Sequence, residues 1–441
     1  MKLQRASIRN YRVIQELDIL LHPQLTVLIG DNAVGKTCVL DALAVGLGPI
    51  VKRATKRFAG GGGTRDIRRI NGKTEPFSIV QLESAAGVVW DRRALRDETD
   101  QTRNEAGEAF ERKGQAALYE AIDPAISARA AGVDGPPLPV LAYYGADRTA
   151  GPRGFGGLGW LASAREPEHP SLSALDGALS PMASFRAGFR WFMEAEAEEL
   201  REQRDTSPDF VHPGLAAVRR AIEAVIPGAT NPRVAGKRPR MVVTFREPDG
   251  HGEDLDLDEL SGGYRSMLAL VVDLARRMAL ANPALGIESE AIVLIDEVDL
   301  HLHPRWQQTV VGDLIRAFPN AQFIMTTHSE QVIASVEPEN VLRVERTTTG
   351  ITLTRPSSTY GATPDRITGL VMGLDHLRPK EVEEVLAEYW GFIRQDAGES
   401  HAAKALRAKL DGWFRGLDPE LVRADAEIHR RAMLKKLRGT E

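Results

Sequence analysis

The stretch LIGDNAVGKT, residues 28–37, decides the fold. It runs from an apolar strand into a glycine-spaced turn, and it fits the phosphate-loop pattern G-x-x-x-x-G-K-[ST] between a strand and a helix. In such a loop, successive backbone N–H groups wrap a phosphate and the helix N-terminus adds its positive end. Lys36 would reach the outer phosphates. The residues that we predict to contact a nucleotide here are Gly30, Asn32, Ala33, Val34, Gly35, Lys36, Thr37 and Cys38.

An acidic strand end supplies the second part of this chemistry. The segment IVLIDE, residues 292–297, is an apolar run that ends in Asp296 and Glu297. Asp296 would hold magnesium together with Thr37, and Glu297 would polarise the attacking water. Adjacent acids at a strand end are often only solvated caps. In a chain that already has a phosphate loop, the pattern favours the catalytic interpretation.

A serine and two glycines open a long helix in LSGGY, residues 260–264. The N–H groups and small hydroxyl of Ser261, Gly262 and Gly263 could form a second anion site, although Ser261 could equally be an ordinary N-cap. One nucleotide needs only one phosphate loop. A second site makes sense if two subunits face each other head to tail and each completes the other's pocket.

These motifs, together with TTHS at residues 326–329, resemble those of the ABC-type ATPases. The resemblance implies that His328, at the end of another apolar strand, is the switch histidine that contacts the γ-phosphate. Lys36 and Ser261 are 225 residues apart, which argues against the nucleotide domain of a transporter. The chain between them lacks long heptads, which argues against an SMC-type coiled coil.

Two further segments narrow the resemblance. IRNYR, residues 8–12, resembles the opening strand of RecF-like and OLD-like ATPases, which implies that Arg12 approaches the nucleotide. Tyr11 could do so too, or could simply be core. LIDEVDLHLHP followed by Trp306, with FPNAQFIMTTHSEQVI, resembles a bacterial group of this class. That group includes the Septu and retron-associated antiphage defence ATPases.

The chain departs from the family pattern at the signature and after the catalytic glutamate. Tyr264 stands where a glutamine or glutamate usually follows SGG. His303 stands where SMC-like relatives have an aspartate that signals across the dimer, so His301 or His303 would take over that role. The pair HLH could suggest zinc, but two histidines without a third ligand make a poor zinc site.

The resemblance implies ATP and Mg²⁺ as cofactors. It also implies a glutamine that contacts the magnesium ion, and the sequence offers two places for this switch. Gln81 is one, and the strand that leads to Asp147 and Arg148 is the other.

The order of elements predicts an α/β fold with a largely parallel core sheet. With the resemblance, the prediction is an ABC-type P-loop NTPase head with an antiparallel β subdomain, a helical insertion and a helical C-terminal appendage. A helix should run from Gly35 to about Leu47, FSIVQLES and GVVWDRR should form a hairpin, and the basic NPRVAGKRPR should be a solvated face or turn. The predicted divisions are an N-terminal lobe at 1–150, the insertion at 151–240, a C-terminal lobe at 241–360 and the helical region at 361–441.

Composition limits the remaining classes. The 441 residues are 43% hydrophobic and 27% charged, as in a globular protein with a sizeable core. The single cysteine, Cys38, excludes an internal disulfide and a thiolate zinc cluster, and it suits the reducing cytoplasm. We find no signal peptide and no membrane span, so no membrane partner is expected. The net charge of −5 gives no overall attraction to nucleic acid.

Two hypotheses follow for the use of the ATPase. The first is an ATP-driven switch, a head-to-tail dimer or a larger even assembly, that controls an associated effector such as a nuclease; the resemblance supplies the antiphage defence part. The second is a RecF-like recombination or repair factor whose ATP-closed dimers clamp DNA through basic surfaces. A stand-alone nuclease is disfavoured because the chain shows no acidic or Cys/His set that would cut nucleic acid. Aromatic faces in residues 365–441 would either pack on their own domain or dock a partner.

Overall fold

The computed structural model describes most of the chain, which forms two compact units, Met1–Ile367 and Thr368–Glu441. The proposed switch at Asp147 and Arg148 lies outside the described residues. The described residues are 1–57, 63–109, 111–146, 169–181, 185–237, 239–246, 252–347, 350–371, 378–415 and 418–438.

A six-stranded sheet in the order β15-β14-β3-β13-β12-β8 forms the centre of the first unit. Every neighbouring pair is parallel except the edge pair of β14 with β15. Strands β3, β8, β12 and β13 are buried along their whole length, which is why they read as near-continuous apolar runs. The strands are β3 (Leu25–Ile29), β8 (Val140–Tyr144), β12 (Ala291–Ile295), β13 (Ala321–Thr326), β14 (Val341–Thr347) and β15 (Gly350–Thr354).

The topology of this sheet brings the sequence motifs together. Strand β3 leads into the phosphate loop, β12 ends before Asp296, and β13 ends two residues before His328. Because β13 lies between β3 and β12, the three carboxyl ends are neighbours on one edge of the sheet. Ligands of open α/β sheets bind at this edge.

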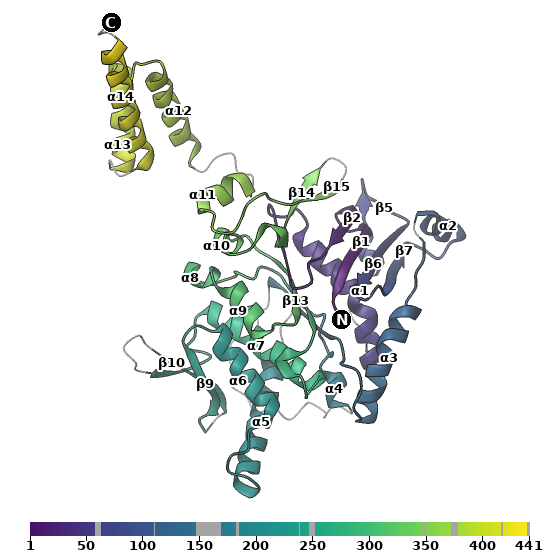
Figure 1. The fold of residues 1–441 in the computed structure, drawn as a ribbon. Helices are drawn as coiled ribbons and strands as arrows, with labels where there is room; N and C mark the ends of the chain where they lie inside the picture. Colours follow the sequence, from purple (N-terminus) through teal and green to yellow (C-terminus); the bar gives the residue numbers. More distant parts are fainter. Residues whose placement is uncertain are drawn as a thin grey trace. The chain divides into compact units, whose positions relative to one another are not determined.

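An antiparallel sheet in the order β2-β1-β6-β7 forms the β subdomain, which Figure 1 shows beside helix α1. The predicted hairpin is confirmed, because β6 and β7 pair in antiparallel register. The strands are β1 (Leu3–Tyr11), β2 (Ile14–Leu20), β6 (Phe77–Ser84) and β7 (Val89–Leu95), and a short ladder joins β4 (Arg69–Ile70) to β5 (Lys73–Thr74).

A third sheet, in the order β11-β10-β9, contains most of the basic segment at 231–240. The prediction of a solvated face or turn agrees with it, because most of these residues are exposed or partly exposed and residues 236 and 237 form a turn. That turn joins β9 (Ala229–Ala235) to β10 (Arg240–Arg246), which also pairs with β11 (Gly252–Asp256). The charges are accommodated by carboxylates of the third strand, because Arg233 pairs with Asp254 and Arg240 with Asp256. The region predicted as a helical insertion therefore also contains a strand.

Helices cover the sheets of the first unit. Helix α1 (Lys36–Thr55) extends past the predicted end at Leu47, through Pro49, because Val51 and Ala54 are buried by packing. Among the described residues, no helix combines the length and apolarity needed to span a membrane. The other helices are α2 (Asp100–Ala109), α3 (Ala116–Ala131), α4 (Pro170–Ser173), α5 (Phe185–Asp205), α6 (Pro213–Val225), α7 (Gly262–Ala281), α8 (Pro304–Gln307), α9 (Val310–Ala317), α10 (Glu330–Ile333) and α11 (Pro364–Arg366); short turns of other helix types are η1 (Thr64–Asp66), η4 (Gly286–Glu288), η5 (Pro338–Asn340) and η6 (Ile367–Val371).

Helix α7 carries a buried charge cluster in its middle. Asp273 is 1% exposed and accepts hydrogen bonds from Arg276 at 2.9 Å, from Arg277 at 2.7 Å and from the hydroxyl of Tyr144 at 3.1 Å. Arg277 also donates to the carbonyl of Ala174 at 2.6 Å, so it ties the helix to the chain after α4. Burial raises the pKa of Asp273, but the two arginines more than offset it and hold the pKa below its usual value.

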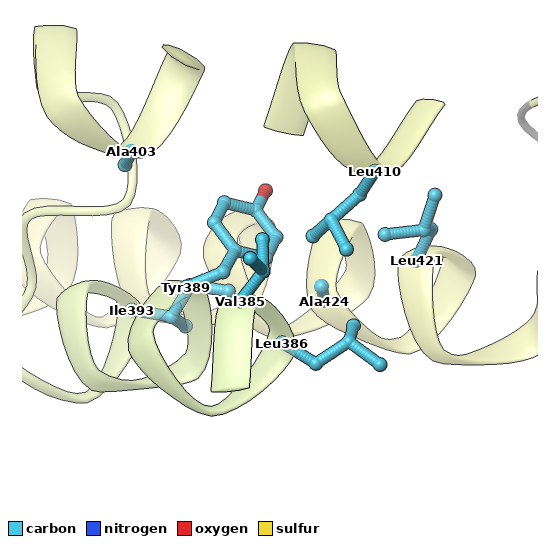
Figure 2. Close-up of a cluster of buried hydrophobic side chains, with 8 residues drawn as sticks. All are labelled: Val385, Leu386, Tyr389, Ile393, Ala403, Leu410, Leu421 and Ala424. Carbon is cyan, nitrogen blue, oxygen red and sulfur yellow. The ribbon is translucent and has the colours of Figure 1, made fainter. Parts of the chain in front are cut away.

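The second unit is built from α12 (Lys380–Arg394), α13 (His401–Phe414) and α14 (Pro419–Arg438). Figure 2 shows its core, where side chains from all three helices meet. Of the aromatic residues predicted to form apolar faces, Tyr389 is buried in this core, and Trp390, Phe392 and Phe414 pack against it. Trp413 is 39% exposed. The buried core residues are Val385, Leu386, Tyr389, Ile393, Ala403, Leu410, Leu421 and Ala424.

The charge cluster of α7 yields a stability prediction. Asp273→Asn keeps the size of the side chain but removes the charge between two buried arginines, so the free energy of unfolding should fall by about 3–5 kcal/mol. Asp205→Asn is the matched control, because it removes an exposed pair with Arg204 and should leave stability nearly unchanged. Urea unfolding at neutral pH measures both. Equal effects of the two substitutions would show that the arginines do not depend on Asp273.

Candidate active site

The phosphate loop takes a backbone path that only glycine tolerates at two points. Gly30 has φ of 142°, and a Cβ there would lie 2.4 Å from the carbonyl oxygen of Val344. Gly35 has φ of 117°, and a Cβ there would lie 2.7 Å from the side chain of Ile351. Between them, Ala33 also has a positive φ, of 59°. The two glycines thus let the loop turn tightly against β14 and β15 before α1 begins.

Lys36 lies inside this loop. Its side-chain nitrogen donates to the carbonyl oxygens of Gly30 at 2.9 Å and of Asp31 at 2.8 Å, and the residue is 7% exposed. Burial lowers the pKa of Lys36, while Asp296 and Glu297 act in the opposite direction. A buried ammonium that is held only by carbonyl oxygens of its own loop gains from an anionic ligand, as a nucleotide phosphate would be.

Asp296, directly after β12, is hydrogen-bonded to the end of β13 and to the start of α1. One of its carboxylate oxygens accepts from the Thr37 hydroxyl at 2.9 Å, and the other accepts from the Thr326 hydroxyl at 2.6 Å. The Thr326 oxygen in turn accepts from the backbone N–H of Glu297 at 2.8 Å. The Thr37 hydroxyl and the Asp296 carboxylate are hard oxygen donors, of the kind that Mg²⁺ prefers.

Glu297 follows directly in a constrained backbone conformation. Its φ is 49°, in the left-handed region that residues other than glycine seldom adopt. The residue is partly buried, and its carbonyl oxygen accepts from the N–H of Leu300 at 3.0 Å. Strained backbone of this kind is concentrated at functional sites, where it aims a side chain.

His328 lies close to the same charges. Burial lowers its pKa below the usual 6.5, and the nearby Lys36 lowers it further, while Asp299, Glu297 and Asp296 oppose the shift. The imidazole is therefore neutral at neutral pH and can donate or accept one hydrogen bond without carrying charge. The structure thus gathers Lys36, the acidic pair and His328 at one edge of the sheet.

Arg12 lies alongside the first turns of α1. Its guanidinium donates to Asp66 at 2.9 Å and to Asp41 of α1. Burial raises the pKa of the Cys38 thiol above its usual value, and the charge of Arg12 offsets only part of this increase. Tyr11 is 1% exposed and belongs to the core of the β subdomain. Both predicted side chains have a polar group near α1, since the buried Tyr11 hydroxyl also lies within electrostatic reach of Asp41 and Cys38, but Arg12 is the one that pairs with Asp41.

The signature segment lies at the start of α7, apart from the phosphate loop. Ser261 occupies the N-cap position, but its side chain makes no capping hydrogen bond and is exposed, which disfavours the ordinary-cap interpretation. Gly263 is packed against the loop after Glu297, because a Cβ there would lie 2.4 Å from the carbonyl oxygen of His301. In the described part of the chain, the hydrogen bonds of Lys36 and Thr37 go to Gly30, Asp31 and Asp296, and none reaches Ser261.

The side chain of Tyr264 packs in an aromatic cluster next to the signature segment. Its ring lies 4.8 Å from that of Trp306 and 5.5 Å from that of Phe245, the second pair in a T-shaped arrangement. Trp306 is 5% exposed and belongs to α8, which follows the histidine loop. The departure from the family pattern at Tyr264 thus has a structural role, because it joins the signature helix to α8.

The two histidines of HLH have different surroundings. His301 has φ of 61° and packs against Gly262 and Gly263, whereas the ring of His303 caps α8 by accepting from the N–H of Arg305 at 3.3 Å. Within the described ranges, no three His, Cys, Asp or Glu side chains gather as a metal cluster. His301 is therefore the histidine that touches the signature segment.

Several contacts of the site were not predicted from the sequence. The most important of them is the hydrogen bond from Thr326 to Asp296. The sequence indicated it only through a polar residue at the end of an apolar strand, two residues before His328. The ion pairs of Arg12 with Asp41 and Asp66 could not be predicted from the sequence, because the three residues come from separate segments of the chain. Gln81 lies in the middle of β6, opposite Ser7 and Asp91, so its magnesium contact stays a prediction.

Comparisons with known proteins agree with this geometry. A family model described as "AAA domain" matches residues 5–206, which contain the phosphate loop. A second, described as "AAA domain, putative AbiEii toxin, Type IV TA system", matches residues 160–334, which contain Ser261, Glu297 and His328.

Three known proteins are similar to the chain in sequence. The "Retron Ec83 probable ATPase" of Escherichia coli is 25% identical, over 96% of this chain and 86% of its own length. The "Retron Vc95 probable ATPase" of Vibrio cholerae serotype O1 biovar El Tor is 24% identical, over 77% of this chain and 73% of its own. "Septu protein PtuA" of Bacillus mycoides (strain KBAB4) is 48% identical over 17% of this chain and 10% of its own. Together with the site geometry, the two AAA-domain matches and the relatives named as probable ATPases support an ATPase with an ABC-type P-loop head.

The contact between Gly263 and His301 yields a second prediction. Gly263→Ala places a methyl group against the His301 carbonyl, so one of the two segments must move, and the free energy of unfolding should fall by about 1–3 kcal/mol. Gly262→Ala is the matched control, since its Cβ would lie 3.9 Å from the nearest atom and alanine favours the helix. Thermal and urea unfolding compare the two. If Gly263→Ala were as stable as Gly262→Ala, the signature helix would not be packed on the histidine loop.

Proposed function

We propose that this ABC-type ATPase is the switch subunit of a bacterial antiphage defence system. In this proposal, two copies close head to tail over ATP and Mg²⁺, hydrolysis reopens them, and the motion controls an associated effector of the nuclease class in the cytoplasm. The single observation that carries the proposal is that Lys36 and Asp296 sit in one hydrogen-bonded site while the exposed Ser261 hydroxyl has no part in it.

The division of the site supports a dimer. A signature serine that does not cap its own helix is free to bind the γ-phosphate held by another copy. An isologous pair of this kind would form two composite sites, each with the phosphate loop of one copy and the signature of the other. The names of the similar retron and Septu proteins support the defence role.

The residues of the site fit the parts of ATP hydrolysis. Thr37 and Asp296 would hold Mg²⁺, which when bound neutralises phosphate charge. Lys36 would bind the outer phosphates, and Glu297, aimed by its constrained backbone, would orient the water and accept its proton. The neutral His328 would donate a hydrogen bond to the γ-phosphate and so report its presence.

The second unit supports an effector in the proposal. It is compact by itself and is not needed to build the nucleotide site, whose residues all belong to Met1–Ile367. Trp413, Val422 and Met433 expose 39%, 62% and 70% of their surface on its helices. Exposed apolar side chains on a helical unit suit a protein partner.

The Glu297→Gln variant tests the switch. It should bind ATP but lose turnover by about 10²- to 10⁴-fold, and it should stay assembled in ATP because reopening needs hydrolysis. Lys36→Ala is the control that should bind no nucleotide and whose assembly should not respond to ATP. Steady-state phosphate release and light scattering with and without ATP measure the two effects. Full turnover in Glu297→Gln would remove this residue as the base.

The same variant distinguishes the effector hypothesis from a DNA clamp. A nuclease that stays with the ATP-bound Glu297→Gln form after co-expression with its neighbouring genes supports the switch. ATP-dependent binding of duplex DNA by the chain alone, weakened by salt, supports a RecF-like factor instead.

Mixing two inactive variants tests whether sites are shared. Lys36→Ala and Ser261→Arg each damage both composite sites of a homodimer, but a mixed dimer keeps one site with an intact loop and an intact signature. Random pairing of equal amounts should restore about a quarter of wild-type turnover. No recovery, when both variants are folded and assemble with each other, would place the complete site within one chain.

A further inference from the structure

A cavity lies in the first unit, between the later turns of α1, strand β7 and the segment before α3. It has a volume of about 350 Å³. It is lined by Pro49, Lys52, Asp91, Arg92, Arg93, Arg112, Gly114 and Gln115. Lys52 is 16 residues beyond Lys36 in the same helix, which corresponds to about 24 Å along its axis. The cavity is therefore separate from the nucleotide site.

The lining of this cavity is strongly basic. Lys52, Arg92, Arg93 and Arg112 carry four positive charges, and Asp91 is the single carboxylate, so the sum at neutral pH is 4 − 1 = +3. Glu111 lies next in sequence, but its carboxylate pairs with Lys113 at 2.7 Å.

Asp91 positions the walls of the cavity through hydrogen bonds as well as offsetting part of its positive charge. The residue is 3% exposed, and one carboxylate oxygen accepts from the backbone N–H groups of Lys113 and Gly114, the latter at 2.7 Å. Its other oxygen lies 3.7 Å from Arg93. These bonds hold the segment before α3, which carries Arg112, against β7.

We propose that this cavity binds a small ligand that carries phosphate groups. Its volume is in the range of small-molecule sites, and a lining that contains three arginines and a lysine suits the oxygens of a phosphate or pyrophosphate. Nucleic-acid surfaces instead spread their cations along an extended track. Burial lowers the pKa of Arg92, so an anion there would stabilise its charged form.

The cavity also has a connection to the nucleotide site. Arg92 lies within electrostatic reach of Asp66 and Tyr11, and Asp66 accepts the hydrogen bond from Arg12 at 2.9 Å. Arg12 also pairs with Asp41 of α1. Arg92 thus belongs to the same group of neighbouring charges as Arg12.

Titration of the full chain with inorganic pyrophosphate tests the proposal. The experiment uses the Lys36→Ala variant, in which the phosphate loop no longer competes for the probe, and follows binding by calorimetry and ³¹P NMR. One site should be seen, and adding Arg92→Gln or the exposed Arg112→Gln should weaken it at least about tenfold. Arg53→Gln is the matched control, since Arg53 lies next to Lys52 but pairs with Asp123 at 2.8 Å, and it should leave binding unchanged.

Three results would overturn the proposal. One is the absence of pyrophosphate binding, and another is binding that neither Arg92→Gln nor Arg112→Gln weakens. The third is binding of a 20-base-pair DNA duplex, lost on the same substitutions, without pyrophosphate binding; the cavity would then be a contact for a nucleic-acid backbone. Thermal unfolding of each variant, compared with Arg53→Gln, separates loss of the site from loss of the fold.

Discussion

The two hydrogen bonds accepted by Asp296 are the constraint on which the site depends. They reach Thr37 at the start of α1 and Thr326 at the end of β13, so one carboxylate fixes the ends of β12 and β13 relative to the helix that follows the phosphate loop. Thr326 then fixes the N–H of Glu297. A carboxylate that is 5% exposed remains favourable only while these partners are in place, so the phosphate loop and the acidic pair are positioned together.

A second buried network ties the signature helix to the same strand ends. The carbonyl of Tyr144 accepts from the N–H of Asp296 at 2.8 Å, and its hydroxyl donates to Asp273 in the middle of α7. A movement of α7 is therefore resisted by Tyr144, whose backbone is hydrogen-bonded to Asp296. Paired buried charges make such a connection rigid, because breaking one bond leaves a charge without a partner in a medium of low polarity.

The parts of the fold that the sequence predicts are those encoded locally. The runs around β3, β12 and β13 are apolar because both faces are covered, and the phosphate loop carries its glycines where the backbone requires them. The parts that it does not predict depend on distant partners. Strand β9 reads as polar because Arg233 meets Asp254, and α1 continues past Pro49 because Val51 and Ala54 find a buried surface. Thr326 and Asp66 became visible only when separate strands and loops were brought side by side.

The aromatic cluster explains how the chain can depart from the family pattern at the signature. A glutamine or glutamate after SGG would be polar, whereas Tyr264 packs on Trp306 of α8, and Gly263 meets the His301 carbonyl just before that helix. The signature segment, the histidine loop and α8 are thus held by one set of contacts. That loop begins at Glu297 of the same copy. In the proposed dimer, Ser261 of one copy would bind the phosphate held by the other copy. The bound phosphate would therefore act on a segment that leads to Glu297, the residue that would orient water in the first copy's own phosphate-loop site. In that proposed dimer, the packing of these segments would carry the communication that an aspartate at the position of His303 carries in SMC-like relatives.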